Sequence, residues 1–217
     1  MKKEILELVK EKYEEGDFKY HISAVVKNAM LLAGRLKADK EVVEMAAYLH
    51  DIARSLNRED VKEFVKENIH HIEGAEQSKE FLKELGYDNE FIEKVAHCVL
   101  AHRGRAEPNP ETLEAKIVAC ADAMAHFDTF LDLFNVFLKT ADSFEDAVIR
   151  IEKKMQRDWE IKLTLPEAKE IVKEKYEAIM LLIKSMKEYI QQSEEKQELA
   201  TPSWGIEHKS MPNMGFE

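Results

Sequence analysis

The sequence predicts an all-α protein. Its 217 residues include only 7 Gly and 5 Pro, too few turn residues for an all-β sandwich. Apolar residues recur with the spacing of one helix face along most of the chain, and 45% of all residues are hydrophobic. We therefore expect a bundle of amphipathic helices around one core.

Clear start and stop signals separate the helices expected in the first half. Gly16 and Asp17 end the first helix, and Asp39 caps a strongly apolar one. Gly86 ends a later helix cleanly. The expected helices after the first cover residues 20–38, 42–53, 60–66, 72–85 and 89–102.

The second half begins with a loop over residues 103–110, where a Gly and two Pro interrupt any helix. Residues 112–139 form one continuous helical pattern that is nearly free of charge in its middle. Ser143 is suited to cap the next helix, and Pro166 to begin a last one that reaches about residue 192.

The domain organisation follows from this pattern. We expect residues 1–197 to form a single helical domain, with the helices of residues 143–192 appended to its main part. Residues 198–217 lack a helical period, and they are predicted to form a tail that is either disordered or docked through Trp204 and Phe216.

Charge and composition exclude several classes of function. The formal net charge of -11 disfavours extended nucleic-acid binding, which depends on many contacts from Lys and Arg to phosphates. Cys98 and Cys120 lie in apolar runs and are expected to be reduced core residues. The sequence shows no secretion signal and no apolar stretch of the ~18 residues that spanning a membrane requires, so we expect a cytoplasmic protein without membrane contact.

Two aspartates in apolar helices need a functional explanation. Asp51 follows His50 near the end of a very apolar helix, and Asp122 is the single carboxylate in the run KIVACADAMA. An ionised carboxylate in such a place is costly unless it is paired, hydrogen-bonded or bound to a metal. With His21, which opens an earlier helix, these residues form a mixed N/O set suited to a divalent transition metal.

The order of these residues resembles the H…HD…D signature of the HD-domain phosphohydrolase superfamily. The segment ETLEAKIVACADAM is similar to the helix that ends in the last ligand of that family, and the resemblance covers about residues 18–130. It implies an HD-domain-like helical bundle in which water attacks a phosphorus centre beside one or two ions of Mn, Fe, Co, Ni or Zn. The implied metal ligands are His21, His50, Asp51 and Asp122.

Further histidines resemble those of the family members that carry a second set. His71 begins the pattern His-x-x-Gly-Ala, and His102 precedes the loop. If both face Asp51, that carboxylate bridges a second metal, and otherwise both contact substrate phosphate. His97 is the alternative to His102, although a helical wheel favours His102. His70 is expected to be the exposed neighbour of His71.

Arginines are the expected substrate contacts. Arg54 follows His50 by one helical turn and is suited to bind phosphate or to stabilise negative charge in the transition state. The catalytic residues are thus predicted to be Asp51, Arg54, His71 and His102. The cations Arg103, Arg105 and Lys116 are predicted to form an anion entrance.

The predicted function is that of a small hydrolase acting on a nucleotide or another small phosphorylated metabolite. The sequence HDIARS lacks the acidic pair of the alarmone hydrolases, and residues 103–110 lack the Gly-Tyr-Pro segment of the cyclic-dinucleotide group. The alternative is a non-catalytic nucleotide sensor or scaffold that retains the metal site. The apolar residues 131–138 either lie in the core or form, with the final helix, a homodimer interface.

Overall fold

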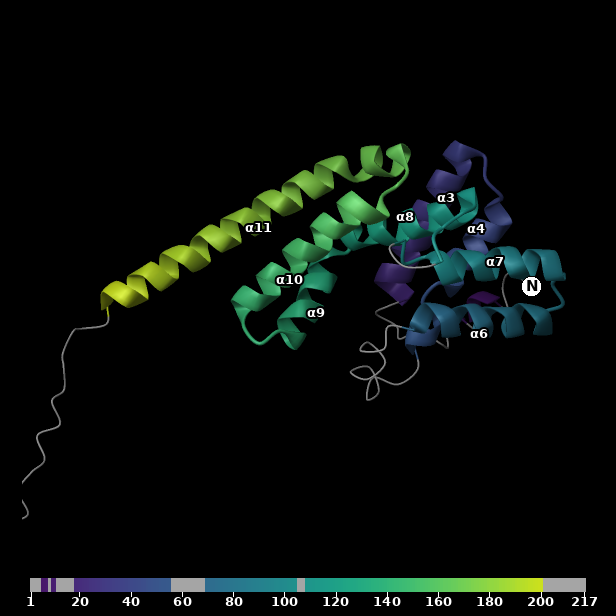
Figure 1. Cartoon of the computed structure of the whole chain (residues 1–217), viewed down its shortest axis with the longest axis horizontal. Helices are drawn as coiled ribbons and strands as arrows, with labels where there is room; N and C mark the ends of the chain where they lie inside the picture. The colour runs from purple at the N-terminus through teal and green to yellow at the C-terminus, as the bar shows by residue number, and fades with distance from the viewer. Residues whose placement is uncertain (1–4, 8, 11–17, 56–68, 105–107, 201–217) are drawn as a thin grey trace, which may run out of the picture.

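The computed structural model describes residues 5–7, 9–10, 18–55, 69–104 and 108–200. Every regular element in these ranges is a helix and none is a strand, which confirms the predicted all-α class (Figure 1). From residue 18 onward the elements are η1 (Phe18–Ile22), α3 (Ser23–Leu36), α4 (Lys40–Leu49), η2 (Ile52–Ser55), α6 (His70–Glu84), α7 (Asn89–Ala101), α8 (Leu113–Asp128), α9 (Phe130–Thr140), α10 (Phe144–Arg157), η3 (Asp158–Lys162) and α11 (Pro166–Ala200).

Helix α8 lies at the centre of the bundle. It packs against α3, α4, α7 and α11, and every residue from Ile117 to Phe127 is buried. Five of its alanines, including Ala119 and Ala123, have small side chains that let the neighbouring helices approach closely. This burial explains the nearly charge-free run in the sequence, and it makes the polar side chains of α8 the ones that need partners.

The helix predicted over residues 112–139 is in fact two helices. Thr129 ends α8 and begins α9 with non-helical torsions of φ -111° and ψ 34°, and its hydroxyl donates a hydrogen bond to the carbonyl of Ala125 at 2.9 Å. A threonine hydroxyl that bonds back to a carbonyl one turn earlier bends a helix. The prediction of one helix was therefore wrong. The break was missed because no Gly or Pro marks it in the sequence.

The helices that carry His21 and the His50-Asp51 pair also differ from the prediction. His21 lies in η1, a π turn that precedes α3, and Lys37, the residue after the end of α3, has a positive φ of 55°. Helix α4 ends at Leu49, before the predicted residue 53, and the chain continues into the 3-10 turn η2. Both changes of helix type occur beside the polar residues that the sequence singles out, as is common at functional sites.

Several helix ends agree with their predicted caps. The carboxylate of Asp39 accepts hydrogen bonds from two backbone amides of α4, and the Ser143 hydroxyl accepts one at the start of α10. Helix α7 begins at Asn89 as predicted, and its cap is Asp88, which was not among the predicted caps. Helix α11 begins at Pro166 as predicted but continues to Ala200, past the expected end near residue 192. The predicted tail began at residue 198, but residues 198–200 belong to α11. The helix predicted over residues 60–66 and the rest of the tail lie outside the described residues.

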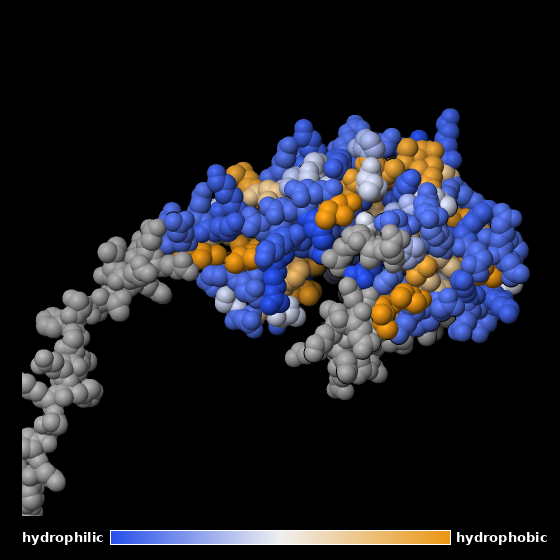
Figure 2. Space-filling view, viewed as in Figure 1, coloured by the Kyte–Doolittle hydropathy of each residue, from blue (hydrophilic) through white to orange (hydrophobic). Residues whose placement is uncertain are grey.

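The surface of α9 and α11 retains exposed apolar side chains. Leu131 on α9 and Leu181 on α11 are 74% and 68% exposed. These two side chains therefore do not lie in the core. The alternative, a homodimer interface, stays a prediction. Hydrophilic residues dominate the face of the molecule in Figure 2, with smaller apolar patches among them. Among the helices described, none combines the length and hydropathy that crossing a membrane requires.

Candidate metal centre

Asp51 is the carboxylate around which one part of the centre is arranged. Its Oδ2 atom lies 3.6 Å from Nε2 of His50 and 4.0 Å from Nε2 of His21. Its Oδ1 atom lies 3.4 Å from Nε2 of His102 and 3.8 Å from Nε2 of His70. The turn between α4 and η2 thus directs the two oxygens of one carboxylate toward two different pairs of imidazoles.

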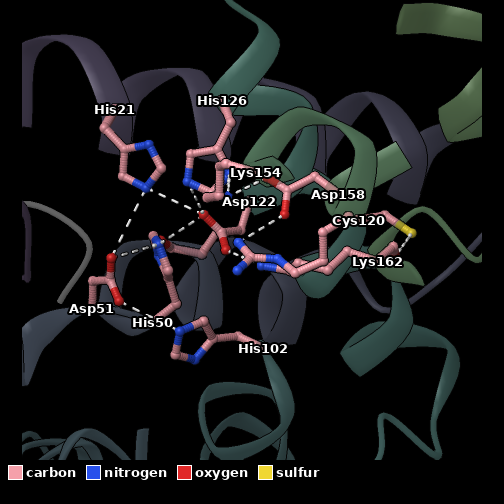
Figure 3. A network of polar contacts seen from close by, with 12 residues as sticks. His21, His50, Asp51, His102, Cys120, Asp122, His126, Lys154, Asp158 and Lys162 are labelled. Atoms are coloured by element: carbon pink, nitrogen blue, oxygen red, sulfur yellow. Dashed lines mark hydrogen bonds and ion pairs between the residues drawn. The ribbon is translucent and has the colours of Figure 1, made fainter. Parts of the chain in front are cut away.

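Asp122 on α8 is the second carboxylate of the centre. Its Oδ1 atom lies 3.3 Å from Nε2 of His21, 3.5 Å from Nε2 of His126 and 3.9 Å from Nε2 of His50. Its Oδ2 atom accepts a hydrogen bond from the ammonium of Lys162 (Figure 3). One oxygen therefore faces the imidazoles while the other is neutralised by a buried cation.

Backbone carbonyls fix the orientation of two rings. The Nδ1 atom of His50 lies 2.8 Å from the carbonyl of Ala47, and that of His102 lies 2.6 Å from the carbonyl of Val99. A carbonyl only accepts, so each Nδ1 carries the proton and each Nε2 presents a lone pair to the carboxylates. This is the usual arrangement of histidines that bind metals.

The donor set fits a divalent transition metal. Nε2 of His21, Nε2 of His50 and Oδ1 of Asp122 are buried and make no hydrogen bond within the described ranges. Imidazole nitrogen together with carboxylate oxygen suits such ions. Within the part of the chain that the structure describes, three overlapping sets of residues have ligand atoms within 4.8 Å of one another, namely His21, His50 and Asp51; Asp51, His70 and His102; and His21, Asp122 and His126.

The protonation states also suit metal binding. Burial lowers the pKa of His50 to about 4, against the opposing effect of Asp51 and Asp122, so the ring is neutral near pH 7. Burial raises the pKa of Asp122, but Lys162, His126 and other neighbours outweigh it and hold that pKa well below its usual range. At neutral pH the carboxylate is ionised and the ring is neutral, which are the forms that bind a cation.

A further polar layer comes from α10 and η3. Nδ1 of His126 lies 2.8 Å from Oδ2 of Asp158 and 2.7 Å from Nζ of Lys154. The same Oδ2 atom accepts a hydrogen bond from Lys154, and Oδ1 of Asp158 accepts one from Arg157. Burial lowers the pKa of Lys154 to about 7. Burial raises the pKa of Asp158, but His126 and the cations hold it below its usual range. Asp158 is therefore ionised at neutral pH.

The sequence did not single out His126, Asp158 or Lys162. His126 follows Asp122 by one turn of an apolar helix, and that spacing was a usable signal. Nothing comparable marked Asp158 and Lys162, because 32 residues separate His126 from Asp158 and 40 separate Asp122 from Lys162.

His70 corrects another expectation. It was predicted to be exposed, but it is only 6% exposed and is the histidine of α6 that groups with Asp51 and His102. His71 is equally buried but belongs to none of the three sets. Gly74, where a Cβ atom would lie 3.8 Å from the carbonyl oxygen of His50, does not separate the two, because residues three and four positions earlier both lie on its helix face.

The remaining predicted residues lie as follows. His102 is the α7 histidine that joins the centre, and the alternative His97 belongs to none of the three sets. The backbone of Arg54 lies in η2, three residues after Asp51, but its side chain and residue Arg105 lie outside the described part. Arg103 is buried, and Lys116 is half-buried on α8. The roles given to these residues stay predictions.

A helical bundle with buried histidines and aspartates at its centre is the architecture of one known protein family. The HD domain family model matches residues 18–126, half of the chain, so the chain belongs to the HD domain family. The match includes η1, α3, α4, η2, α6, α7 and nearly all of α8. It ends at His126, before α10 and η3.

Two kinds of relative are similar in sequence. A tRNA (cytidine(56)-2'-O)-methyltransferase of Picrophilus torridus is 31% identical over 145 residues, which are 61% of this chain and 39% of that protein. Ribonuclease Y of Thermoanaerobacter pseudethanolicus is 29% identical over 134 residues, 61% of this chain and 23% of that protein. The chain thus spans well under half of the length of these relatives.

Two solved structures share the fold. YpgQ of Bacillus subtilis has a TM-score of 0.66 at 18% identity, over 87% of this chain and 94% of that one. A predicted HD superfamily hydrolase from an uncultured Thermotogales bacterium has a TM-score of 0.56 at 23% identity, over 85% of this chain and 90% of that one. These likenesses extend beyond the family match and support an HD-domain bundle.

Proposed function

We propose that this chain is a metal-dependent phosphohydrolase. The observation that carries the proposal is the position of Asp51, whose two oxygens face two different pairs of imidazoles. A carboxylate in that position is suited to bridge two cations, as in the two-metal sites that cleave phosphoesters. A closed structural site would require only one set of ligands.

The first ion would be held by His21, His50, Asp51 and Asp122. The second would be held by Asp51 and His102, with His70 in place of the predicted His71. Mn, Fe, Co, Ni and Zn all suit this donor set. Such ions lower the pKa of bound water and offset charge on phosphoryl oxygens.

The chain's own residues would orient the substrate. Arg54 follows Asp51 by three residues, and a guanidinium binds phosphate oxygens in a planar, bidentate way. The buried Lys162 holds one oxygen of Asp122 and thereby keeps the other directed at the imidazoles. Buried walls around the carboxylates limit the access of bulk water and strengthen these electrostatic contacts.

The proposed substrate is a nucleotide or another small phosphorylated metabolite. One structure with the same fold, YpgQ of Bacillus subtilis with a TM-score of 0.58, was solved in complex with ADP, which supports a nucleotide. The relatives named ribonuclease Y favour a second candidate, the phosphodiester of a short RNA. A non-catalytic nucleotide sensor is the alternative without chemistry.

The test combines metal analysis with a product screen. The purified chain would be stripped with a chelator, reloaded separately with Mn²⁺, Co²⁺, Ni²⁺ and Mg²⁺, and assayed for products from nucleotides, dinucleotides, phosphosugars and a short oligoribonucleotide. We expect metal-dependent cleavage of a nucleotide. Oligonucleotide cleavage alone would favour the second candidate, and nucleotide binding without turnover would favour the sensor.

The homodimer is a separate proposal that rests on the exposed apolar side chains of α9 and α11. Light scattering on the eluting protein would measure its mass. Leu131→Glu and Leu181→Glu, on these two helices, are expected to shift a dimer toward the monomer mass of 25.2 kDa. A wild-type chain that elutes as a monomer at all concentrations would contradict the proposal.

A further inference from the structure

Helix α8 and the π turn η3 face one another through two matched pairs of side chains. Asp122 and His126 are one turn apart on α8, and Lys162 and Asp158 are four residues apart on η3. Lys162 contacts Asp122, and Asp158 contacts His126 (Figure 3). The π turn thus supports both polar residues of the buried α8 face, although it lies outside the part of the chain that matches the family.

The ring of His126 is directed at the metal centre. Its Nε2 atom lies 3.5 Å from Oδ1 of Asp122, and its plane stacks on His21 with centroids 5.2 Å apart at 16°. An ion with ligands at ~2.1 Å holds adjacent ligand atoms about 3.0 Å apart and opposite ones about 4.2 Å apart. The separations of 3.3 and 3.5 Å around Oδ1 of Asp122 fall within that range.

The opposite edge of the His126 ring has the support that metal-binding histidines need. Its Nδ1 atom lies 2.8 Å from the carboxylate of Asp158, whose side chain is fully buried. An ionised carboxylate only accepts, which favours the tautomer with the proton on Nδ1; Nζ of Lys154 also lies 2.7 Å from Nδ1 and donates to the same carboxylate. In that tautomer Nε2 keeps its lone pair. A histidine that donates one N–H to a carboxylate and uses its other nitrogen for the metal is a recurring arrangement.

We propose that His126, oriented by Asp158, is an additional ligand of the ion held by His21 and Asp122. This inference rests on the proposed metal site and extends it by one protein ligand beyond the four-residue signature. It also gives α10 and η3 a role, because they supply the side chains that hold the His126 ring in place.

Cobalt binding tests the inference without relying on activity. The metal-free full-length chain would be titrated with Co²⁺ alone while its visible absorption, which depends on the ligands of the ion, is recorded. We expect His126→Ala to weaken binding by ~10²-fold or more and to change the spectrum. Asp158→Asn retains the shape of the side chain and should weaken binding by about 10–100-fold.

Controls separate a lost ligand from a damaged fold. His97→Ala removes a histidine that belongs to none of the three sets and should bind Co²⁺ like the wild type. Circular dichroism would check the helical content of each variant, and Asp158→Asn decides the matter if His126→Ala does not fold.

The outcomes distinguish this inference from the proposed function. If both variants bind Co²⁺ with the affinity and spectrum of the wild type, this inference is overturned but the proposed function is not. That holds even if hydrolysis falls, since His126 would then contact the substrate instead of the metal. A wild-type chain that binds no Co²⁺ would overturn the metal site, and the proposed function with it. Weakened binding in both variants, with normal His97→Ala, would support the inference.

Discussion

The two carboxylates of the centre are supported in different ways. The Asp51 half consists of Asp51, His70 and His102. The His102 ring is held by a hydrogen bond to the backbone carbonyl three residues earlier. The Asp122 half consists of Asp122 and His126, and side chains from η3 support both residues. His21 and His50 lie between the halves, within 4.0 Å of both carboxylates.

This difference shows what each half requires of the chain. A local carbonyl orients a ring by helix geometry alone, so the Asp51 half is complete within the residues that match the HD domain family. The Asp122 half depends on contacts with η3, in which Asp158 lies 32 residues after His126 and Lys162 lies 40 residues after Asp122. Its buried charges are compensated only when η3 packs against α8, and substitutions in η3 therefore test both stability and the site.

The largest effect is expected for Asp51→Ala, because both proposed ions share this residue. The metal affinity of the variant should be at least ~10²-fold lower than that of the wild type, because the loss of a residue that only orients a ligand already costs up to about 100-fold. The variant should not hydrolyse substrate. Metal content after desalting and product release would measure both effects. Unchanged activity would place the reaction elsewhere in the protein.

Lys162→Met should produce the largest loss of stability. The change leaves the buried carboxylate of Asp122 without its ammonium, and breaking a buried pair in this way costs about 3–5 kcal/mol. Lys175→Met is the matched control, since Lys175 pairs with Asp128 but is 51% exposed, and such pairs contribute less than about 1 kcal/mol. Denaturant unfolding of the metal-free proteins would measure the unfolding free energy of both variants. Equal losses in the two variants would contradict a special role for the buried pair.

Arg54 should affect turnover more than metal binding. A guanidinium has no atom that binds a metal, and it stays protonated. Arg54→Ala should lower kcat by ~10²–10³, by analogy with the loss of one preorganised donor, while Co²⁺ affinity stays the same. Arg54→Lys should recover little if the contact is bidentate. A normal kcat with lost metal would instead make Arg54 a structural partner of a carboxylate.

The stability of the metal-free protein should fall as the pH is lowered from 6.5 to 4. Burial lowers the pKa of His50 and of His126 to about 4, while an unfolded histidine keeps 6.5, so the unfolded state binds more protons in this window. Each ring contributes at most ~3 kcal/mol. His126→Gln should reduce the slope of unfolding free energy against pH, and an unchanged slope would exclude that ring as a source.

The sequence predicted the parts of the fold that depend on local chemistry. The caps at Asp39 and Ser143 and the burial of the charge-free run in α8 follow from residue types and spacing alone. The break at Thr129 did not, because a threonine bends a helix only when its hydroxyl bonds back to the preceding turn.

The candidate site shows the same division. The residues brought together around the two carboxylates include His21, His50 and His102, which the sequence singled out by their order and helix face. The choice between His70 and His71 depended on where α6 begins, two residues before the predicted start. The partners supplied by η3 depended on a π turn whose packing is set by contacts 32 to 40 residues apart.

The smallest expected effect distinguishes these two neighbouring histidines of α6. Nε2 of His70 lies 3.8 Å from Oδ1 of Asp51, whereas His71 belongs to none of the three sets found among the described residues. His70→Ala should reduce kcat/KM by about 10–100-fold whether the ring binds an ion or donates to substrate phosphate, since a hydrogen bond to a charged group contributes about 1.5–3 kcal/mol. His71→Ala should change kcat/KM less than His70→Ala does. Both side chains are equally buried, so unfolding measurements on the two variants would separate packing from function. A larger loss in His71→Ala at equal stability would return the role to His71 and show that the Asp51 half rearranges when metal binds.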